Sequence, residues 1–188
     1  MPGGCAMEKS AGRVYLQVLV VRCQLGDRDA FAELVAACQP RLRAYLNRML
    51  AEPHRVDDVS QDVWMDVFND LPRLLNPAAF MPWLYRIAHN RCARAMRRRE
   101  AVAGGDDCGI ADEAADEKEF GPEDAAAVHA ALGRLSPPHR EVLLLKFLED
   151  MSYHDIAAVT GVPVGTVRSR IHNAKVALRK IMENERLT

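Results

Sequence analysis

The chain has 188 residues, of which 49% are hydrophobic, and a formal net charge of −1. This length allows one or two small domains with enough apolar content to bury a core. No apolar run approaches the ~20 residues of a membrane span, and the five cysteines include no C-x-x-C pair, which argues against a zinc knuckle or a disulfide framework. We therefore expect a soluble intracellular protein, without direct membrane insertion, from a reducing compartment.

Helical periodicity dominates the N-terminal part of the chain, and no alternating strand pattern appears. After a short extension, residues 1–13, the pattern from Val14 to about Leu50 predicts two helices that are separated at Gly26. Pro40 lies within the second pattern and predicts either a kink or a new helix start there.

A third helix is predicted from about Val56 to Leu71. Valines form its inner face, which Trp64 and Phe68 widen. A solvated surface is the default interpretation of its polar face, but basic segments elsewhere in the chain favour a docking surface for a basic protein partner. The polar face carries Asp58, Gln61, Asp62, Met65, Asp66 and Asn69.

A fourth helix, from about Ala78 to Arg99, is rich in arginine. Leu84 to Arg99 contains six arginines and no acid, so this helix should attract a phosphate backbone. The Asn90 amide is suited to reading a base edge, and interleaved aromatic residues are what a single-strand site requires for stacking. Trp83 and Tyr85 fit either that role or the hydrophobic core.

The segment from Ala101 to Glu123 has no periodicity. Ala101 to Asp124 holds nine acids and one lysine, which predicts a flexible acidic linker. Helical patterns return over 125–135 and 138–148 and continue to the C-terminus. The predicted fold is therefore all-α, with a helical bundle over 14–100 and a second small helical domain over 124–188.

The second domain carries a helix-turn-helix pattern. Ser152 can cap the first helix, with Asp155 returning the bond, and Gly161 and Pro163 end that helix before the pattern resumes. Because no acidic residue occurs between Ile156 and Met182, the second helix is basic and suited to the major groove of duplex DNA.

The second helix of this motif should pack through Val162, Val167 and Ile171 onto Ile156 and Val159 of the first. A helical hairpin with a solvated basic face is the alternative, but the turn residues and the acid-free run favour DNA binding. The residues expected near base edges are Thr166, Arg168, Ser169, His172 and Asn173, and those expected mainly at phosphates are Arg170, Lys175 and Arg179.

The motifs of this chain resemble those of the extracytoplasmic-function, or group IV, sigma factors of RNA polymerase. The resemblance covers about Val14 to Met182, with the motifs in the family's order. The matching segments are Leu25–Phe31, Asp57–Asp62, Trp83–Asn90, Leu135–Val142 and Met151–Ile171.

The resemblance implies an alternative sigma factor that directs promoter-specific initiation by bacterial core polymerase. The β′ clamp and the β flap would be its protein contacts, and the promoter would be single-stranded at −10 and duplex at −35. Clamp contacts would come from Asp58, Gln61, Asp62 and Met65. Contacts to the −10 element would come from Asn76, Trp83, Arg86, Asn90, Arg94 and Arg97, and those to the −35 element from Thr166, Arg168, Ser169, Arg170, His172, Asn173 and Lys175.

The resemblance also implies regulation by an anti-sigma factor. Such an inhibitor would hold a cytoplasmic protein inactive, in some cases at the inner membrane. The acidic linker would run through polymerase, where its charge imitates nucleic acid. No cofactor and no metal are expected.

Asn173 departs from the family pattern, which commonly has Arg at this position. An Asn amide matches the N6 and N7 atoms of adenine, whereas Arg matches guanine. We therefore expect a −35 preference that differs from the usual family sequence at one base.

Two other classes of protein share some of these features. A transcription regulator with an N-terminal sensing domain would need a ligand pocket or a phospho-acceptor, and the arginine-rich helix and acidic face argue against it. A nucleic-acid-processing enzyme would need clustered carboxylates or a metal site. No P-loop, Gly-x-Ser-x-Gly, His-Glu-x-x-His or Rossmann motif occurs, so no enzyme is expected.

Overall fold

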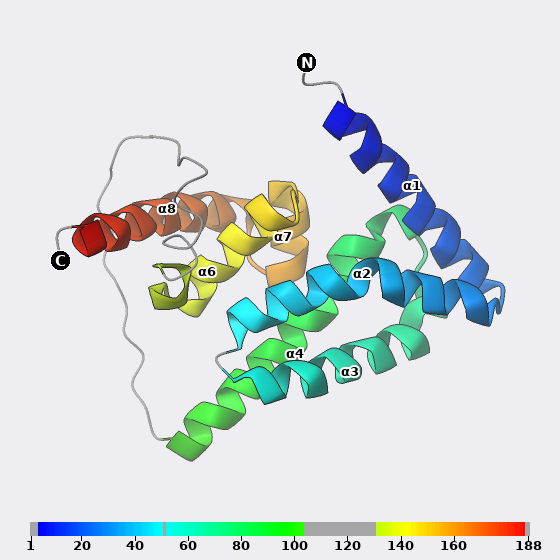
Figure 1. Cartoon of the computed structure of the whole chain (residues 1–188), viewed down its shortest axis with the longest axis horizontal. Coiled ribbons are helices and arrows are strands. Elements are labelled where there is room, and N and C mark those ends of the chain that lie inside the picture. The colour runs from blue at the N-terminus through cyan, green and yellow to red at the C-terminus, as the bar shows by residue number, and fades with distance from the viewer. Residues whose placement is uncertain (1–3, 51, 104–130, 187–188) are drawn as a thin grey trace. The chain divides into compact units, whose positions relative to one another are not determined.

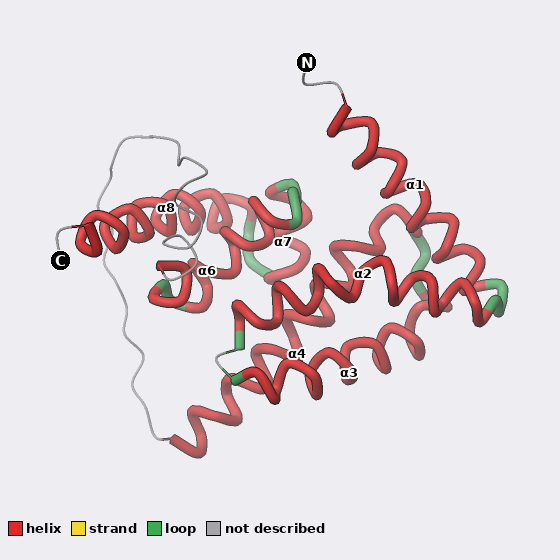
Figure 2. The backbone as a smooth tube through the Cα atoms, viewed as in Figure 1, coloured by secondary structure: helices red, strands yellow, loops and turns green. Residues whose placement is uncertain are grey.

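The computed structural model describes residues 4–50, 52–103 and 131–186 (Figure 1). Every regular element in these ranges is a helix, which confirms the predicted all-α fold (Figure 2). The chain divides into two compact units, one up to Met96 and one from Arg97 onwards. Each unit is described by itself below.

The N-terminal unit is built from long helices joined by short turns. Its first helix begins at Gly4, inside the segment expected to be an extension. Its last helix runs to Ala103, beyond the expected start of the linker, so the residues of that helix from Arg97 onwards belong to the second unit. The rest of that predicted linker lies outside the described residues. The elements are α1 (Gly4–Gln24), α2 (Arg28–Met49), α3 (Pro53–Asp70), the 3₁₀ turns η1 (Leu71–Arg73) and η2 (Pro77–Ala79), and α4 (Phe80–Ala103).

Helix α2 continues through Pro40 without a new helix start. Proline removes one backbone donor, so the carbonyl of Ala36 loses its usual i to i+4 partner. Because Ala36 and Pro40 are both exposed, water can bond that carbonyl in place of the missing N–H.

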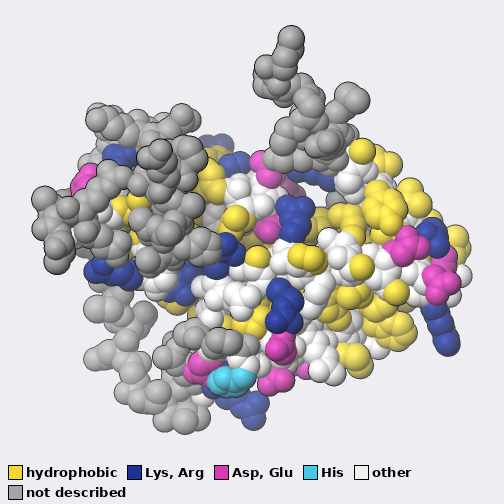
Figure 3. All heavy atoms as spheres, in the orientation of Figure 1, with side chains coloured by type: hydrophobic (Ala, Val, Ile, Leu, Met, Phe, Trp, Pro, Cys, Tyr) yellow, Lys and Arg dark blue, Asp and Glu magenta, His cyan; other side chains and the backbone are white. Residues whose placement is uncertain are grey.

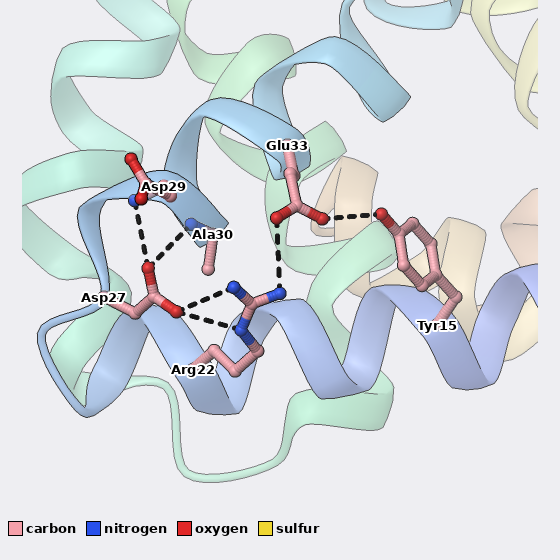
Figure 4. A network of polar contacts seen from close by, with 6 residues as sticks. All are labelled: Tyr15, Arg22, Asp27, Asp29, Ala30 and Glu33. Carbon is pink, nitrogen blue, oxygen red and sulfur yellow. Dashed lines mark hydrogen bonds and ion pairs between the residues drawn. The ribbon is translucent and has the colours of Figure 1, made fainter.

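The turn between α1 and α2 is fixed by the Asp27 carboxylate (Figure 4). Gly26 takes a positive φ of 89°, and the carboxylate of Asp27 then accepts the backbone N–H groups of Asp29 and Ala30, each at 3.0 Å. Arg22 Nε also donates to this carboxylate at 2.9 Å. The Ala30 N–H and then the Arg22 guanidinium lower the pKa of Asp27, because both stabilise its charged form.

The same network fastens α1 along α2. The hydroxyl of Tyr15 donates to Glu33 at 2.9 Å, and Arg22 Nη1 donates to the other oxygen of Glu33 at 3.3 Å (Figure 4). The two ends of this contact lie about two helical turns apart on α1, so the network fixes both the distance and the rotation of the helix pair.

Aromatic contacts bring α4 and α3 into the core of this unit. Tyr85 is fully buried and meets Tyr45 edge to face, with ring centroids 5.1 Å apart, so of its two possible roles it takes the core one. Trp64 is buried as expected. Phe68 was expected on the inner face but is 59% exposed, and its ring meets Phe31 edge to face, with ring centroids 5.2 Å apart.

Apolar side chains also cover part of the outer surface of this unit. Figure 3 shows hydrophobic side chains gathered over the region where α1 and α2 meet. On α1, the exposed residues are Val14, Tyr15, Val18, Val21 and Leu25, opposite the buried Leu19 and Val20. Exposed apolar surface of this kind is typical of contacts with another protein.

The C-terminal unit contains the helix-turn-helix motif. Residues 131–134 are helical, whereas most of the helix predicted over 125–135 lies outside the described residues. The helix predicted over 138–148 is α-helical only to Leu143 and then widens into a π-helical turn. The elements are α6 (Pro137–Leu143), the π turn η4 (Leu144–Leu148), α7 (Tyr153–Thr160) and α8 (Val164–Arg186).

The predicted capping box at the start of α7 is confirmed. Asp155 N–H donates to Ser152 Oγ at 3.1 Å, and Ser152 N–H donates to the Asp155 carboxylate at 3.1 Å. Gly161 ends α7 with a φ of 72°, the left-handed conformation that glycine adopts without a steric penalty. The predicted packing of α8 on α7 is also confirmed, with Ile156, Val159, Val167 and Ile171 buried and Val162 half-buried.

Candidate nucleic-acid and polymerase interfaces

Helix α8 presents the residues that were expected to meet duplex DNA. Its buried residues fall on one side, so the predicted contact residues cover the flanks and the outer side of its first turns. Arg168, Ser169 and His172 are exposed, whereas Thr166, Arg170, Asn173 and Lys175 are half-buried. Half-burial leaves the polar ends of long side chains such as Arg170 and Lys175 accessible.

Two aromatic rings lie beneath cations of this face. The guanidinium of Arg168 lies 5.9 Å from the ring centre of Tyr153, and the ammonium of Lys146 lies 5.2 Å from the same ring. Lys175 lies 5.6 Å from the ring centre of Phe147, which is 60% exposed. These contacts restrict the cations without neutralising them, so their charge remains available to phosphates.

Helix α4 gathers the residues that were predicted to contact the −10 element. Helical spacing places them on one face of the helix. None of the arginines on this face pairs with an acid among the described residues. Trp83 is half-buried and lies 6.1 Å from Phe80, so its ring is only partly taken up by the core. The exposed residues after it are Arg86, Asn90, Arg94 and Arg97.

The loop before α4 adds Asn76 to this end of the unit. The Asn76 side-chain oxygen accepts the N–H of Ala78 at 3.0 Å, which caps η2. Gln24 of α1 donates to the carbonyls of Leu71 and Leu74, at 3.0 and 2.7 Å, and so holds the loop against α1. Leu75 between these points is 98% exposed. The loop is therefore anchored at both ends and presents its centre to solvent.

Helix α3 presents the acidic face that was expected to dock on polymerase. Asp58, Gln61 and Asp62 are exposed, and Met65 is 55% exposed among them. Their exposure is consistent with a protein-binding surface, and the buried valines on the opposite side keep this face turned outwards.

Arg91 of α4 is a residue of this site that the sequence analysis did not assign. Its Nε donates to Asp66 Oδ2 at 2.6 Å, and its Nη1 donates to Asp62 Oδ2 at 3.1 Å. The bond to Asp66, followed by the charges of Asp66 and Asp62, raises the pKa of Arg91. The periodicity of α4 placed Arg91 among six arginines without indicating that its side chain pairs with the acids of α3.

None of the described helices is long and apolar enough to cross a membrane. Within the same residues, no three side chains of His, Cys, Asp or Glu gather in a way that would hold a metal ion.

Two family profiles match the chain in the order of the two units. The profile described as Sigma-70 region 2 matches residues 34–102. The profile described as Sigma-70, region 4 matches residues 125–178. The first match contains the acidic face of α3 and most of α4, and the second contains the helix-turn-helix.

Curated relatives match over most of their length. The RNA polymerase sigma-H factor of Pseudomonas aeruginosa is 34% identical over 185 residues, which cover 89% of this chain and 93% of that protein. The extracytoplasmic-function RNA polymerase sigma-E factor of Escherichia coli K12 is 33% identical over 179 residues, covering 86% and 91%. SigW of Bacillus subtilis is 28% identical over 169 residues, covering 82% and 90%.

Solved structures show the same likeness. The structure of CnrH in complex with the cytosolic domain of CnrY matches with a TM-score of 0.68 and 27% identity, covering 90% of this chain and 98% of that one. The sigma factor RpoE in complex with the anti-sigma factor NepR from Bartonella quintana matches with a TM-score of 0.62 and 26% identity, covering 81% and 96%. With its two sigma-70 regions and these relatives, the chain belongs to the extracytoplasmic-function sigma factors of RNA polymerase.

Proposed function

We propose that this sigma factor holds polymerase and promoter through three separate helical faces. The acidic face of α3 binds the clamp of the β′ subunit, the exposed arginine and asparagine face of α4 binds the −10 element, and the start of α8 reads the −35 element in the major groove. Contacts with the β flap would come from the C-terminal unit, over residues 124–188.

The observation that carries this proposal is the segregation of charge between these faces. A basic partner is attracted to a surface of carboxylates, and a nucleic acid is attracted to cations that no acid neutralises. The exposed acids of α3 meet the first requirement. Arg86 and Arg94 of α4, which are exposed and pair with no acid among the described residues, meet the second within the same compact unit. Opening of the −10 duplex would then be driven by binding of unpaired bases, without nucleotide hydrolysis and without catalysis by the chain.

Charge reversal on α3 tests the docking face. We expect the double change Asp58→Arg and Asp62→Arg to weaken binding of core polymerase by roughly a hundredfold or more, because two attractive contacts become repulsive. Binding is measured by titrating labelled variant with purified core polymerase, and circular dichroism checks that the variant is folded.

A matched variant controls for net charge. Asp29→Arg with Asp57→Arg changes the same number of charges, and both residues are exposed and lie outside the proposed face. The ion pair that Asp57 makes with Arg43 is exposed to solvent, so its loss should cost little stability. This control should bind core polymerase within a few-fold of the unchanged chain. Equal binding by the reversed and control variants would refute the docking assignment.

We further propose that an anti-sigma factor regulates this chain in the bacterial cytoplasm. The support is that two similar structures are complexes, one of CnrH with the cytosolic domain of CnrY and one of the sigma factor RpoE with the anti-sigma factor NepR. An inhibitor of this kind would compete with core polymerase, and a membrane-tethered one would hold the chain at the inner membrane. The expected observation is a bound protein, recovered with the tagged chain from cells, that added core polymerase displaces. Recovery of polymerase subunits alone would count against regulation by such a protein.

A further inference from the structure

The acids of α3 differ in how they are engaged, and one residue of α4 creates the difference. Arg91 forms two hydrogen bonds with Asp66, one from Nε at 2.6 Å and one from Nη2, so that both carboxylate oxygens are used. Its remaining amino group donates to Oδ2 of Asp62 at 3.1 Å. A single guanidinium therefore joins two carboxylates that lie one turn apart on α3.

The three aspartates, spaced four residues apart along α3, thus form a graded series. Asp66 is 32% exposed and is fully engaged, whereas Asp62 is 58% exposed and uses one oxygen only. Asp58 is exposed and makes no hydrogen bond or ion pair with any residue that the structure describes. Asp62 is therefore intermediate: it is more engaged than Asp58 and less engaged than Asp66.

The guanidinium itself is held firmly. The Arg91 side chain is 26% exposed, and its paired bonds to Asp66 fix the plane of the fork. With this plane fixed, the bond to Oδ2 restrains the Asp62 side chain and leaves its Oδ1 without a partner among the described residues.

We propose that Arg91 is a positioning residue for polymerase docking: anchored on Asp66, it holds Asp62 with one carboxylate oxygen outward, ready for a basic group of the clamp. This proposal rests on the docking face proposed above. A side chain that is already restrained loses less conformational freedom when it binds, so the interface gains affinity without an additional contact. Because Arg91 directly follows Asn90, the same contact fixes the DNA-facing helix relative to the docking helix.

The test is a double-mutant cycle on core-polymerase affinity. Arg91→Gln should weaken binding roughly three- to tenfold, because Asp62 becomes mobile. The double variant Arg91→Gln with Asp62→Asn should bind no more weakly than Asp62→Asn alone, since the restrained carboxylate is already lost. Arg91→Gln with Asp58→Asn is the matched control, and its two effects should multiply because Asp58 does not contact Arg91.

Two further variants separate positioning from a merely structural role. Asp66→Asn should reproduce the effect of Arg91→Gln, because it releases the anchor while leaving the docking residues unchanged. Arg91→Lys should recover only part of the affinity, since an ammonium cannot bridge both carboxylates in the fixed geometry of a guanidinium. All affinities are measured at a temperature at which circular dichroism shows each variant to be folded.

Several outcomes would overturn the proposal. If Arg91→Gln lowers the midpoint of thermal unfolding but leaves core affinity unchanged, Arg91 is only structural. Tighter binding by Arg91→Gln would mean that Arg91 competes with polymerase for Asp62. If the effects of Arg91→Gln and Asp62→Asn on core affinity simply multiply, Arg91 does not act through Asp62. If Asp58→Asn and Asp62→Asn each leave core affinity unchanged, the docking face itself is wrong, which is a different failure.

Discussion

Asn173 is the residue at which base recognition is expected to be particular to this chain. It is half-buried on α8, and its amide suits adenine, whereas arginine suits guanine. We predict that Asn173→Arg moves the preference at one −35 position from adenine towards guanine, with a discrimination of about 1–3 kcal/mol. Selection from a promoter library with a randomised −35 element measures this change.

A phosphate-contacting residue provides the comparison for Asn173. Lys175→Ala should weaken binding to all −35 sequences alike and reduce the salt dependence of binding, because a phosphate contact carries no sequence information. If Asn173→Arg leaves the selected sequence unchanged, the assignment of Asn173 to a base edge is wrong.

Individual residues also show where sequence patterns stop being informative. Periodicity assigned Trp64 to the inside of α3 correctly, but Phe68, expected on the same face, is exposed. Periodicity did not determine whether Trp83 and Tyr85 belong to the core or to the surface. Tyr85 belongs to the core because its ring packs against Tyr45 of another helix. Arg91 was missed because its partners lie 25 and 29 residues away, a separation that the pattern of a single helix does not reveal.

Among the elements, the start of α7 depends on a local cap. Ser152→Ala should lower the free energy of unfolding of the C-terminal unit by about 1 kcal/mol, because the N–H of Asp155 loses its acceptor. Ser136 is also an N-cap residue, of α6, but its side chain makes no capping bond, so Ser136→Ala should have little effect. Chemical denaturation of the two variants measures the difference, and equal losses would contradict the role of the capping box.

The turn between α7 and α8 depends on one glycine conformation. Gly161 has a φ of 72°, and a Cβ there would meet nothing within 4 Å, so Gly161→Ala should cost about 1 kcal/mol through backbone strain alone. Gly165 is the second residue of α8 and has equally open surroundings, so Gly165→Ala should stabilise the unit through helix propensity, by less than the ~1 kcal/mol of a helix interior. Opposite shifts of the thermal midpoint are expected, and shifts of the same sign would contradict this account.

Elements were predictable from sequence where their ends are set locally. The capping serine and the turn glycine define α7 through contacts within a few residues, and both were identified correctly. Of the two outcomes expected at Pro40, a new helix start is wrong, because the exposed position of Pro40 lets α2 continue past the missing hydrogen bond. The π turn over 144–148 was not predicted, since α and π turns need the same apolar residues and differ only in their hydrogen-bond partners.

At the scale of the whole molecule, the fold class and the family follow from the order of the motifs. The acidic face, the arginine-rich helix and the helix-turn-helix each had a structural alternative when considered alone. Together they match region 2 and region 4 of the sigma-70 family, on separate compact units. The flexible acidic linker stays a prediction, because most of it lies outside the described residues.

The central claim is that the chain gives core RNA polymerase the ability to start transcription at specific promoters through these two units. Run-off transcription with purified core polymerase, with and without the chain, tests it on templates carrying selected or scrambled −10 and −35 elements. We predict a transcript of defined length only when the chain and both intact elements are present, and a large loss with the Asp58→Arg and Asp62→Arg variant. Promoter-specific transcripts that do not depend on the chain, or none in its presence, would contradict the account.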